Sequence, residues 1–356
     1  MTLLLSNEEV DDLLTMPACL AAMEEAYREL GHGRGVNGVR SEMLTPTDRE
    51  DGLYALLTMG AVIPKFEVGA VRINSDILSW PRTESGLRRV KVPGPDGRYC
   101  GLVLMFSTTT GEPLAIFPDG VVQRMRVGGV SGLAAKYLAR DDARTVGLIG
   151  TGWQAGAQAM AICAVRPIEK ITCYSTNAER CRAFAQQMSD QLGVEMVPAS
   201  SAREAVRGVD VVMCATNSMQ PILMADWVEP GMHVTSLKRL EMDPGVVSRA
   251  NVAFTHVQDA QSYTVRAAGA DLARDTDAQR DRLNEVTGLA KMPTLTDLLL
   301  KKAPGRQSRQ DVTLFLNYAG LGYQFAATGY AVLQQARARG MGRDIPTDWF
   351  TGAVPS

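Results

Sequence analysis

The clearest chemical signal in the chain lies at residues 145–156, T-V-G-L-I-G-T-G-W-Q-A-G. A short apolar run ends in a glycine turn, and an alanine-rich stretch with helical spacing follows to about Val165. This order of strand, turn and helix matches the G-x-G-x-x-G/A pattern, whose glycines allow a sharp turn and the close approach of a pyrophosphate. The N-terminus of such a helix attracts phosphates through its N–H groups and its dipole. The stretch predicts a dinucleotide held by Gly150, Thr151, Gly152, Trp153, Gln154 and Ala155, with a purely structural turn as the alternative.

The end of the next predicted strand bears on which dinucleotide is bound. An acidic residue there would bond the ribose hydroxyls and reject a 2′-phosphate. This chain has Ser175, Thr176 and Asn177 instead, with Arg180 and Arg182 about one helical turn later. Hydroxyl, amide and guanidinium groups accept a phosphate, so the sequence favours NADP(H) over NAD(H). The alternative is that the two arginines are solvated helix charges, which is the commoner fate of arginine.

Two later predicted strands end in residues suited to ligand contact. The carboxyl ends of parallel strands are where ligands bind in sheets of this kind. We therefore expect the cofactor to contact Ala215, Thr216, Asn217, Ser236 and Leu237, although a polar turn is the alternative for residues 216–217. His233 lies well before the carboxyl end of its strand and is predicted to be structural.

The elements that must position these residues change character near residue 145. From there strands alternate with helices, which is typical of a doubly wound parallel sheet. Before it, short strands joined by Gly, Pro and Asp turns predict a largely antiparallel sheet around residues 40–44, 53–59, 68–73, 101–107 and 113–117. Two helices are expected before these strands, the first starting at Ser6-Asn7-Glu8-Glu9 and the second after Met16-Pro17.

The expected fold class is α/β, with a Rossmann doubly wound domain and an α+β domain. We expect residues 80–98 to form a basic loop, 126–140 a bridging helix and 312–338 a long amphipathic helix. The predicted dinucleotide-binding domain is 126–312, and the predicted second domain combines 1–125 with 313–356.

Composition narrows the classes of function. The net charge of −2 over 356 residues gives no reason to expect nucleic acid or an anionic membrane as partner. The N-terminus has neither a basic region nor a long apolar run of the signal-peptide type. Six scattered cysteines suggest reduced thiols and a cytoplasmic location. Three unclustered histidines predict no zinc site.

Five segments, spread over about residues 5 to 338, carry a further signal. They are G-L-I-G-T-G-W-Q-A-G-A-Q, D-V-V-M-C-A-T-N-S-M-Q-P-I-L, D-W-V-E-P-G-M-H-V, D-G-V-V-Q-R-M-R-V-G-G and S-G-L-A-A-K-Y-L-A-R. In combination they resemble the ornithine cyclodeaminase/mu-crystallin family. The resemblance implies NAD(P)(H)-dependent interconversion of amines and imines beside a substrate carboxylate. It also implies that the second domain binds a small amino or imino acid and forms a homodimer.

The resemblance further implies that three arginines bind the substrate carboxylate. Arg40 in V-R-S-E-M-L and Arg126 in M-R-V-G-G match arginines of the family, and Arg72 in G-A-V-R-I-N-S stands where the family usually has a lysine. A guanidinium grips a carboxylate with two parallel hydrogen bonds, so arginine suits this task. Each arginine taken alone is more often a surface or ion-pair residue.

The sequence also departs from the family pattern. Cyclodeaminases carry a catalytic aspartate in a G-x-D-x-P-G-K segment, whereas V-T-S-L-K-R-L-E-M-D here lacks it and offers Lys238 or Glu241. Arg72 is a candidate catalytic residue but exchanges no proton, since arginine stays charged. The proton-donor candidates are therefore Lys238 and Tyr99. Four cations of the predicted loop are candidates for binding a second anionic group of the substrate, namely Arg82, Arg88, Arg89 and Lys91. The alternative is that this loop is merely solvated.

The resulting hypothesis is an NADPH-dependent imine reductase or amino-acid dehydrogenase. The alternatives are an ornithine- or lysine-type cyclodeaminase and a dinucleotide-loaded protein that binds a small acid without turnover. A hydroxy-acid dehydrogenase is disfavoured, because such enzymes use a histidine–carboxylate pair and histidine is scarce here.

Overall fold

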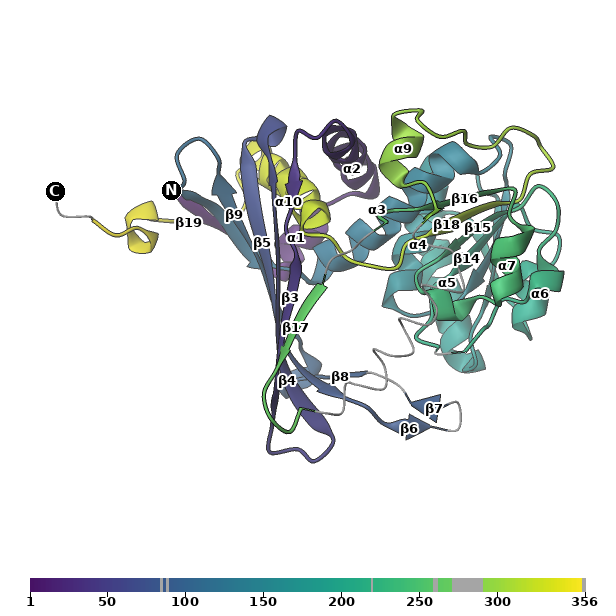
Figure 1. Cartoon of the computed structure of the whole chain (residues 1–356), viewed down its shortest axis with the longest axis horizontal. Coiled ribbons are helices and arrows are strands. Elements are labelled where there is room, and N and C mark those ends of the chain that lie inside the picture. Colours follow the sequence, from purple (N-terminus) through teal and green to yellow (C-terminus); the bar gives the residue numbers. More distant parts are fainter. Residues whose placement is uncertain (84–85, 88–89, 219, 259–261, 271–290, 354–356) are drawn as a thin grey trace.

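The computed structural model describes residues 1–83, 86–87, 90–218, 220–258, 262–270 and 291–353. Two large β-sheets stand side by side, with helices between them and on the far side of the second sheet (Figure 1). Among the described residues, no helix has both the length and the apolar character needed to cross a bilayer.

The first sheet has ten strands, in the order β17-β3-β4-β5-β9-β10-β1-β19, with β2 paired to β4 and β8 to β5. Strands β3, β4, β5, β9 and β10 are antiparallel to their neighbours within this run, which confirms the predicted antiparallel sheet. The strand bounds are β1 Thr2–Leu4, β2 Val36–Asn37, β3 Arg40–Pro46, β4 Gly52–Ile63, β5 Val68–Ser79, β8 Val90–Val92, β9 Cys100–Ser107, β10 Pro113–Pro118, β17 Ser262–Arg266 and β19 Arg343–Ile345.

One face of this sheet builds the main hydrophobic core. Alternate residues of β4, β5 and β9, such as Met59, Val68 and Met105, are buried on that face, as the period of two in a strand requires. They pack against helices α1 (Asn7–Leu13), α2 (Met16–Gly31) and α10 (Gly322–Arg339). The expected start of α1 is confirmed by a capping box between Ser6 and Glu9.

The second sheet has seven parallel strands in the order β13-β12-β11-β14-β15-β18-β16, which is a doubly wound Rossmann arrangement. Every residue of β14, β15 and β18 is buried, as expected for strands covered on both faces. The strand bounds are β11 Thr145–Ile149, β12 Lys170–Tyr174, β13 Glu195–Pro198, β14 Val211–Cys214, β15 His233–Ser236, β16 Val252–Thr255 and β18 Thr313–Leu316. The helices of this part are α4 Trp153–Val165, α5 Ala178–Leu192, α6 Ala202–Val206, α7 Pro244–Arg249 and α9 Leu295–Leu299.

Two local predictions need correction. Residues 313–316 form strand β18 rather than the start of a helix, and α10 begins only at Gly322. The run T-L-F-L is buried between β15 and β16, where a strand satisfies its backbone through both neighbours. The predicted loop 80–98 contains the short strands β6 (Arg82–Thr83), β7 (Gly86–Leu87) and β8, and β8 pairs with the end of β5.

The division into domains at residues 126 and 313 remains a proposal, and two strands do not follow it. Strand β18 lies in the parallel sheet although it belongs to the segment 313–356. Strand β17 lies inside the segment 126–312 but pairs with β3 in the first sheet. Each half therefore contributes one strand to the sheet of the other.

The bridging helix is observed as α3 (Gly120–Leu138), which starts six residues earlier than expected. It lies very close to α4. A Cβ on Gly128 would come within 2.3 Å of the Ala157 carbonyl oxygen, and one on Gly132 within 2.8 Å of the Ala161 Cβ. Glycine at these two positions thus allows the backbones of α3 and α4 to approach closely.

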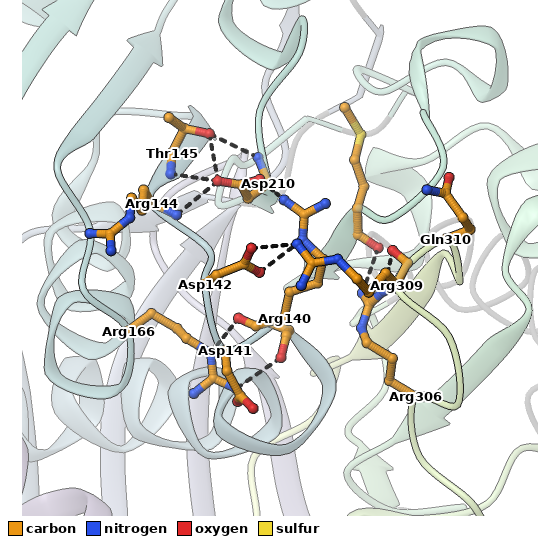
Figure 2. A network of polar contacts seen from close by, with 12 residues as sticks. Arg140, Asp141, Asp142, Arg144, Thr145, Arg166, Asp210, Arg306, Arg309 and Gln310 are labelled. Carbon is orange, nitrogen blue, oxygen red and sulfur yellow. Dashed lines mark hydrogen bonds and ion pairs between the residues drawn. The ribbon is translucent and has the colours of Figure 1, made fainter.

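A polar network ties the C-terminal end of α3 to the amino edge of the parallel sheet (Figure 2). Arg166 donates to the carbonyl oxygens of Lys136 and Ala139, each at 2.8 Å, and so caps the helix end. Asp210 accepts from the backbone N–H groups of Arg144 and Thr145 at 2.8 and 3.0 Å. The Arg166 bonds therefore fasten the end of α3 to the parallel-sheet half, and the Asp210 bonds hold the start of β11 in the same network.

The same region contains His233, which is fully buried on β15 with Nδ1 2.9 Å from Thr313 Oγ1. Burial, reinforced by the charges of Arg306 and Arg166, lowers its pKa from 6.5 to about 3. Below pH 6.5 the unfolded chain therefore binds a proton that the folded chain does not. The free energy of unfolding consequently falls as the pH drops from 6.5 towards 3.

Between about pH 7.5 and about pH 5, His233 should cost the wild type about 2 kcal/mol of its free energy of unfolding. We expect His233→Gln to lack this loss, because glutamine does not bind the proton. Denaturant unfolding at the two pH values measures this difference, and His32→Gln, at an exposed site, is the control. An equal acid loss in wild type and His233→Gln would contradict the assignment.

Candidate active site

A cavity of about 840 Å³ opens at the carboxyl ends of β11, β12, β14 and β15, facing the first sheet. This is the point where the strand order reverses, which is where open α/β sheets bind ligands. Of the predicted cofactor residues only Ala155 and Ser236 do not line it. The lining set is Gly150, Thr151, Gly152, Trp153, Gln154, Ser175, Thr176, Asn177, Arg180, Ala215, Thr216, Asn217 and Leu237.

The glycine turn has the geometry that a dinucleotide requires. Gly150 has φ +108°, and a Cβ there would lie 2.3 Å from the Ala215 carbonyl oxygen. Gly152 is the N-cap of α4 with no side-chain cap, and a Cβ at this residue would meet no atom within 4 Å. Ala155, fully buried, is the small residue that lets α4 pack on its strand. The turn therefore presents a helix N-terminus to open space and fits a pyrophosphate.

The polar group at the end of β12 lies at one end of the same cavity. Asn177 is the N-cap of α5, and its Oδ1 accepts the backbone N–H of Arg180 at 2.9 Å. Ser175, Thr176 and Arg180 line the cavity beside it. Hydroxyl and guanidinium donors thus meet at the position where an acidic residue would select NAD(H).

A buried carboxylate joins the two loops after β14 and β15. Glu241 accepts hydrogen bonds from Thr216 Oγ1 at 2.6 Å, Ser236 Oγ at 2.9 Å and the Lys238 backbone N–H at 3.1 Å, and also from the Thr216 backbone N–H. Burial raises its pKa. Ser236 therefore lies behind the cavity wall and supports it. The sequence placed Glu241 near the chemistry, but the structure assigns it to holding cavity-lining loops together.

Arg126, on α3, is a buried cation with neutral partners. Its two Nη atoms donate to Gln324 Oε1 at 2.8 Å and Gln123 Oε1 at 2.9 Å. Burial, together with the charge of Arg72, lowers the pKa of Arg126 to about 9. It lines the cavity, and within the described ranges no carboxylate lies at ion-pair distance from it. A cation in this state attracts an anion from solution.

Arg72 differs from Arg126 because a carboxylate already faces it. Its Nη2 lies 2.6 Å from Asp119 Oδ2, its Nε donates to the same oxygen at 2.7 Å, and Asn74 Nδ2 donates there at 3.1 Å. Burial lowers the pKa of Arg72, and the Asp119 charge opposes that shift. The side chain is 6% exposed and does not line the cavity.

The guanidinium groups of Arg72 and Arg126 both lie near the ring of Phe325, at 4.6 and 5.2 Å from its centroid. A Cβ on Gly101 would lie 2.2 Å from Asp119 Oδ1, so that glycine makes room for the acid. Asp119 and Asn74 were not predicted from the sequence. No local pattern marks them, because they meet Arg72 only through strand pairing and the start of α3.

The other predicted residues separate into those in the cavity and those outside it. Arg40 and Lys238 line it, and Arg40 Nη2 lies 3.7 Å from Glu42 Oε1. Tyr99 is 58% exposed and is not part of the lining. Lys91 Nζ lies 2.6 Å from Asp76 Oδ2, so this loop cation has an internal partner. The side chains of Arg82, Arg88 and Arg89 lie outside the described part of the chain.

The segment after β18 forms a wall of the cavity that sequence reasoning missed. Asn317 Nδ2 donates to the Val127 carbonyl and to Ser131 Oγ, both at 3.0 Å, which joins this segment to α3. A Cβ on Gly320 would lie 3.1 Å from Arg126 Nη2. The lining residues that were not predicted are Gln123, Val127, Ile149, Tyr174, Ser218, Ile222, Asn317, Tyr318, Ala319 and Gly320.

Comparison with known proteins gives consistent matches over nearly the whole chain. The family model described as the ornithine cyclodeaminase/mu-crystallin family matches residues 1–339. A Delta(1)-pyrroline-2-carboxylate reductase from Bacillus cereus is 29% identical over 248 residues, covering 69% of this chain and 74% of the relative.

Two solved structures share the fold. Delta(1)-pyrroline-2-carboxylate reductase from Thermococcus litoralis, in complex with NADH and L-proline, is 26% identical with a TM-score of 0.76, covering 97% of this chain and 100% of that one. An archaeal alanine dehydrogenase dimer with bound NAD is 23% identical with a TM-score of 0.74, covering 97% and 99%.

Proposed function

Because the chain belongs to the ornithine cyclodeaminase/mu-crystallin family, we propose that it is an NAD(P)H-dependent oxidoreductase acting on the C–N bond of a small amino or imino acid. The observation that carries this proposal is Arg126, a cation held by two amide oxygens in the wall of a cavity that also contains the glycine turn. The Thermococcus litoralis relative is in complex with NADH and the cyclic amino acid L-proline, which supports the same substrate class.

In this proposal Arg126 and Arg40, which line the same cavity as the glycine turn, bind the substrate carboxylate. Two guanidinium hydrogen bonds orient the carboxylate and the adjacent carbon. When bound, the nicotinamide cofactor supplies or accepts the hydride. Lys238 is the proposed proton donor to the substrate nitrogen, since it lines the cavity and Glu241 fixes its backbone. Arg72 acts through Asp119 and Phe325 as a positioning residue rather than by touching substrate.

The test is a screen of NADPH and NADH oxidation with cyclic imino acids and with 2-oxo acids plus ammonia or methylamine. Turnover with a carboxylate imine supports the proposal. Ammonia release from ornithine or lysine without net NADH accumulation identifies a cyclodeaminase instead. Saturable binding of small acids without turnover across the panel identifies a binding protein.

For the cofactor we propose a preference for NADPH, supported by the donors at the end of β12. Arg180→Ala should raise KM for NADPH about tenfold, because one partly screened charge-assisted contact to the 2′-phosphate is lost. KM for NADH should stay the same. The control is Arg182→Ala on the same helix, which does not line the cavity. A wild-type preference for NADH would reject the assignment.

We further propose that the protein is a homodimer in the cytoplasm. The described cysteines are all free thiols, which supports that location.

The support for a homodimer is the sheet face opposite the helices, here called the outer face. This face is largely apolar, and its side chains are partly exposed. Its residues share one side of successive strands by register: Leu4, Leu56, Val62, Val71, Ile73, Leu102, Leu104, Phe106 and Ile116. A largely apolar face of this kind suits an identical partner face, and the archaeal alanine dehydrogenase with this fold is a dimer.

A further inference from the structure

A segment near the C-terminus forms an arm that projects away from the rest of the protein. Residues 343–353, here called the C-terminal arm, begin with β19, continue into a single turn of 3-10 helix (Thr347–Phe350) and lie beyond the part matched by the family model. In Figure 1 the arm projects to the left, on the side of the ten-stranded sheet away from α2, α10 and the parallel sheet. Trp349 is 74% exposed and Phe350 is 46% exposed.

The base of the arm is firmly attached, which fixes the side of the sheet on which it emerges. Strand β19 pairs antiparallel with β1, placing Ile345 opposite Thr2 and Arg343 opposite Leu4. Thr2 and Leu4 point to the same side of β1, and Leu4 is in register with Ile116 on the outer face. Thr347 Oγ1 lies 3.2 Å from Thr2 Oγ1, so the turn starts over the outer face.

The aromatic residues of the arm are held outward by its own backbone. The Trp349 N–H donates to the Pro346 carbonyl at 3.2 Å, and the Thr351 N–H donates to the Asp348 carbonyl at 3.4 Å. These local bonds close the turn and leave Trp349 and Phe350 exposed. Exposed aromatic side chains next to a large apolar face mark an interaction surface, because burying each ring removes a large apolar area from water.

We propose that the C-terminal arm clasps a second copy of this chain at the rim of the outer face, with Trp349 and Phe350 packed against that copy. The inference rests on the dimer proposed above and adds a contact that lies outside the matched family region. A second copy is the fitting occupant because the arm rises from the same largely apolar face that a symmetric partner would cover. A two-fold axis then supplies two arms, one from each protomer, at opposite rims.

The test measures the dimer dissociation constant by sedimentation at increasing dilution, with the full chain and the double variant Trp349→Ala/Phe350→Ala. We expect the variant dimer to dissociate about thirtyfold more readily, as when an aromatic hot spot is removed. Both positions are exposed, so the monomer fold should persist, and circular dichroism checks this. The control is Glu179→Ala/Arg182→Ala, a double change at exposed positions of α5 beside the parallel sheet, which should leave the constant unchanged.

The possible failures are distinguishable. A wild-type chain that stays monomeric at every concentration overturns both the dimer and the clasp. If the wild type is a dimer and the double variant has the same dimer dissociation constant, the proposed contact of the arm is wrong and the proposed dimer stands. Leu104→Asp, at the centre of the outer face, should produce monomers whether or not the arm takes part, so it tests the face separately. None of these measurements depends on a substrate, so their outcome is independent of the proposed activity that the imine screen tests.

Discussion

Arg126→Ala is expected to lower kcat/KM for carboxylate substrates by about 10²- to 10³-fold, because a charge-assisted pair of hydrogen bonds to the carboxylate is lost. Its partners Gln123 and Gln324 carry no charge, so only Arg40 of the proposed pair is left to hold the carboxylate. Steady-state kinetics with an imino-acid substrate and NADPH measures the effect. KM for NADPH should change little, since Arg126 is proposed to bind the substrate and the glycine turn to bind the cofactor.

Arg124→Ala on the same helix is the matched control, because Arg124 is ion-paired to Asp11 instead of lining the cavity. Arg126→Lys should recover part of the activity, since it restores the charge without the paired geometry. Unchanged catalytic efficiency in Arg126→Ala would remove the central support for the proposed function.

Gly152→Ala is expected to weaken NAD(P)H binding by about 10²-fold while leaving the fold intact. A Cβ on Gly152 meets no protein atom within 4 Å, and its φ of −90° is accessible to alanine. The added methyl group therefore projects into the space proposed for the pyrophosphate, where it prevents close approach of the backbone. Quenching of tryptophan fluorescence by NADPH measures the affinity, and Trp153 in the cavity wall is a suitable reporter.

Gly150→Ala provides the contrast. Its Cβ would lie 2.3 Å from the Ala215 carbonyl oxygen at a φ of +108°, so that variant should lose thermal stability as well as binding. If Gly152→Ala binds NADPH as tightly as the wild type, the dinucleotide does not lie on this turn.

The nucleotide half of the site was predictable from the sequence by itself because its signals are local. The glycine turn is set by consecutive residues, and the polar residues after β12 and β14 follow buried apolar runs whose alternation with helices implies one parallel sheet. In such a sheet the carboxyl ends of neighbouring strands share an edge, so residues that directly follow these strands in the sequence lie near one another in the fold. The same locality explains why the antiparallel strands were predicted correctly. It also explains why the short strand β18 was predicted as helix, since a run of four residues with three apolar side chains fits either period.

Only the tertiary structure decided which arginine is available to a carboxylate. Arg72 meets Asp119 at a separation of 47 residues, and Arg126 meets Gln324 at a separation of 198. Their residue type and motif context gave both the same prediction. The charge that remains for a substrate depends on what each guanidinium faces after folding, and no local pattern encodes a contact of that range. The role of Glu241 and the side of the sheet on which the C-terminal arm emerges were decided in the same way, by packing and strand register.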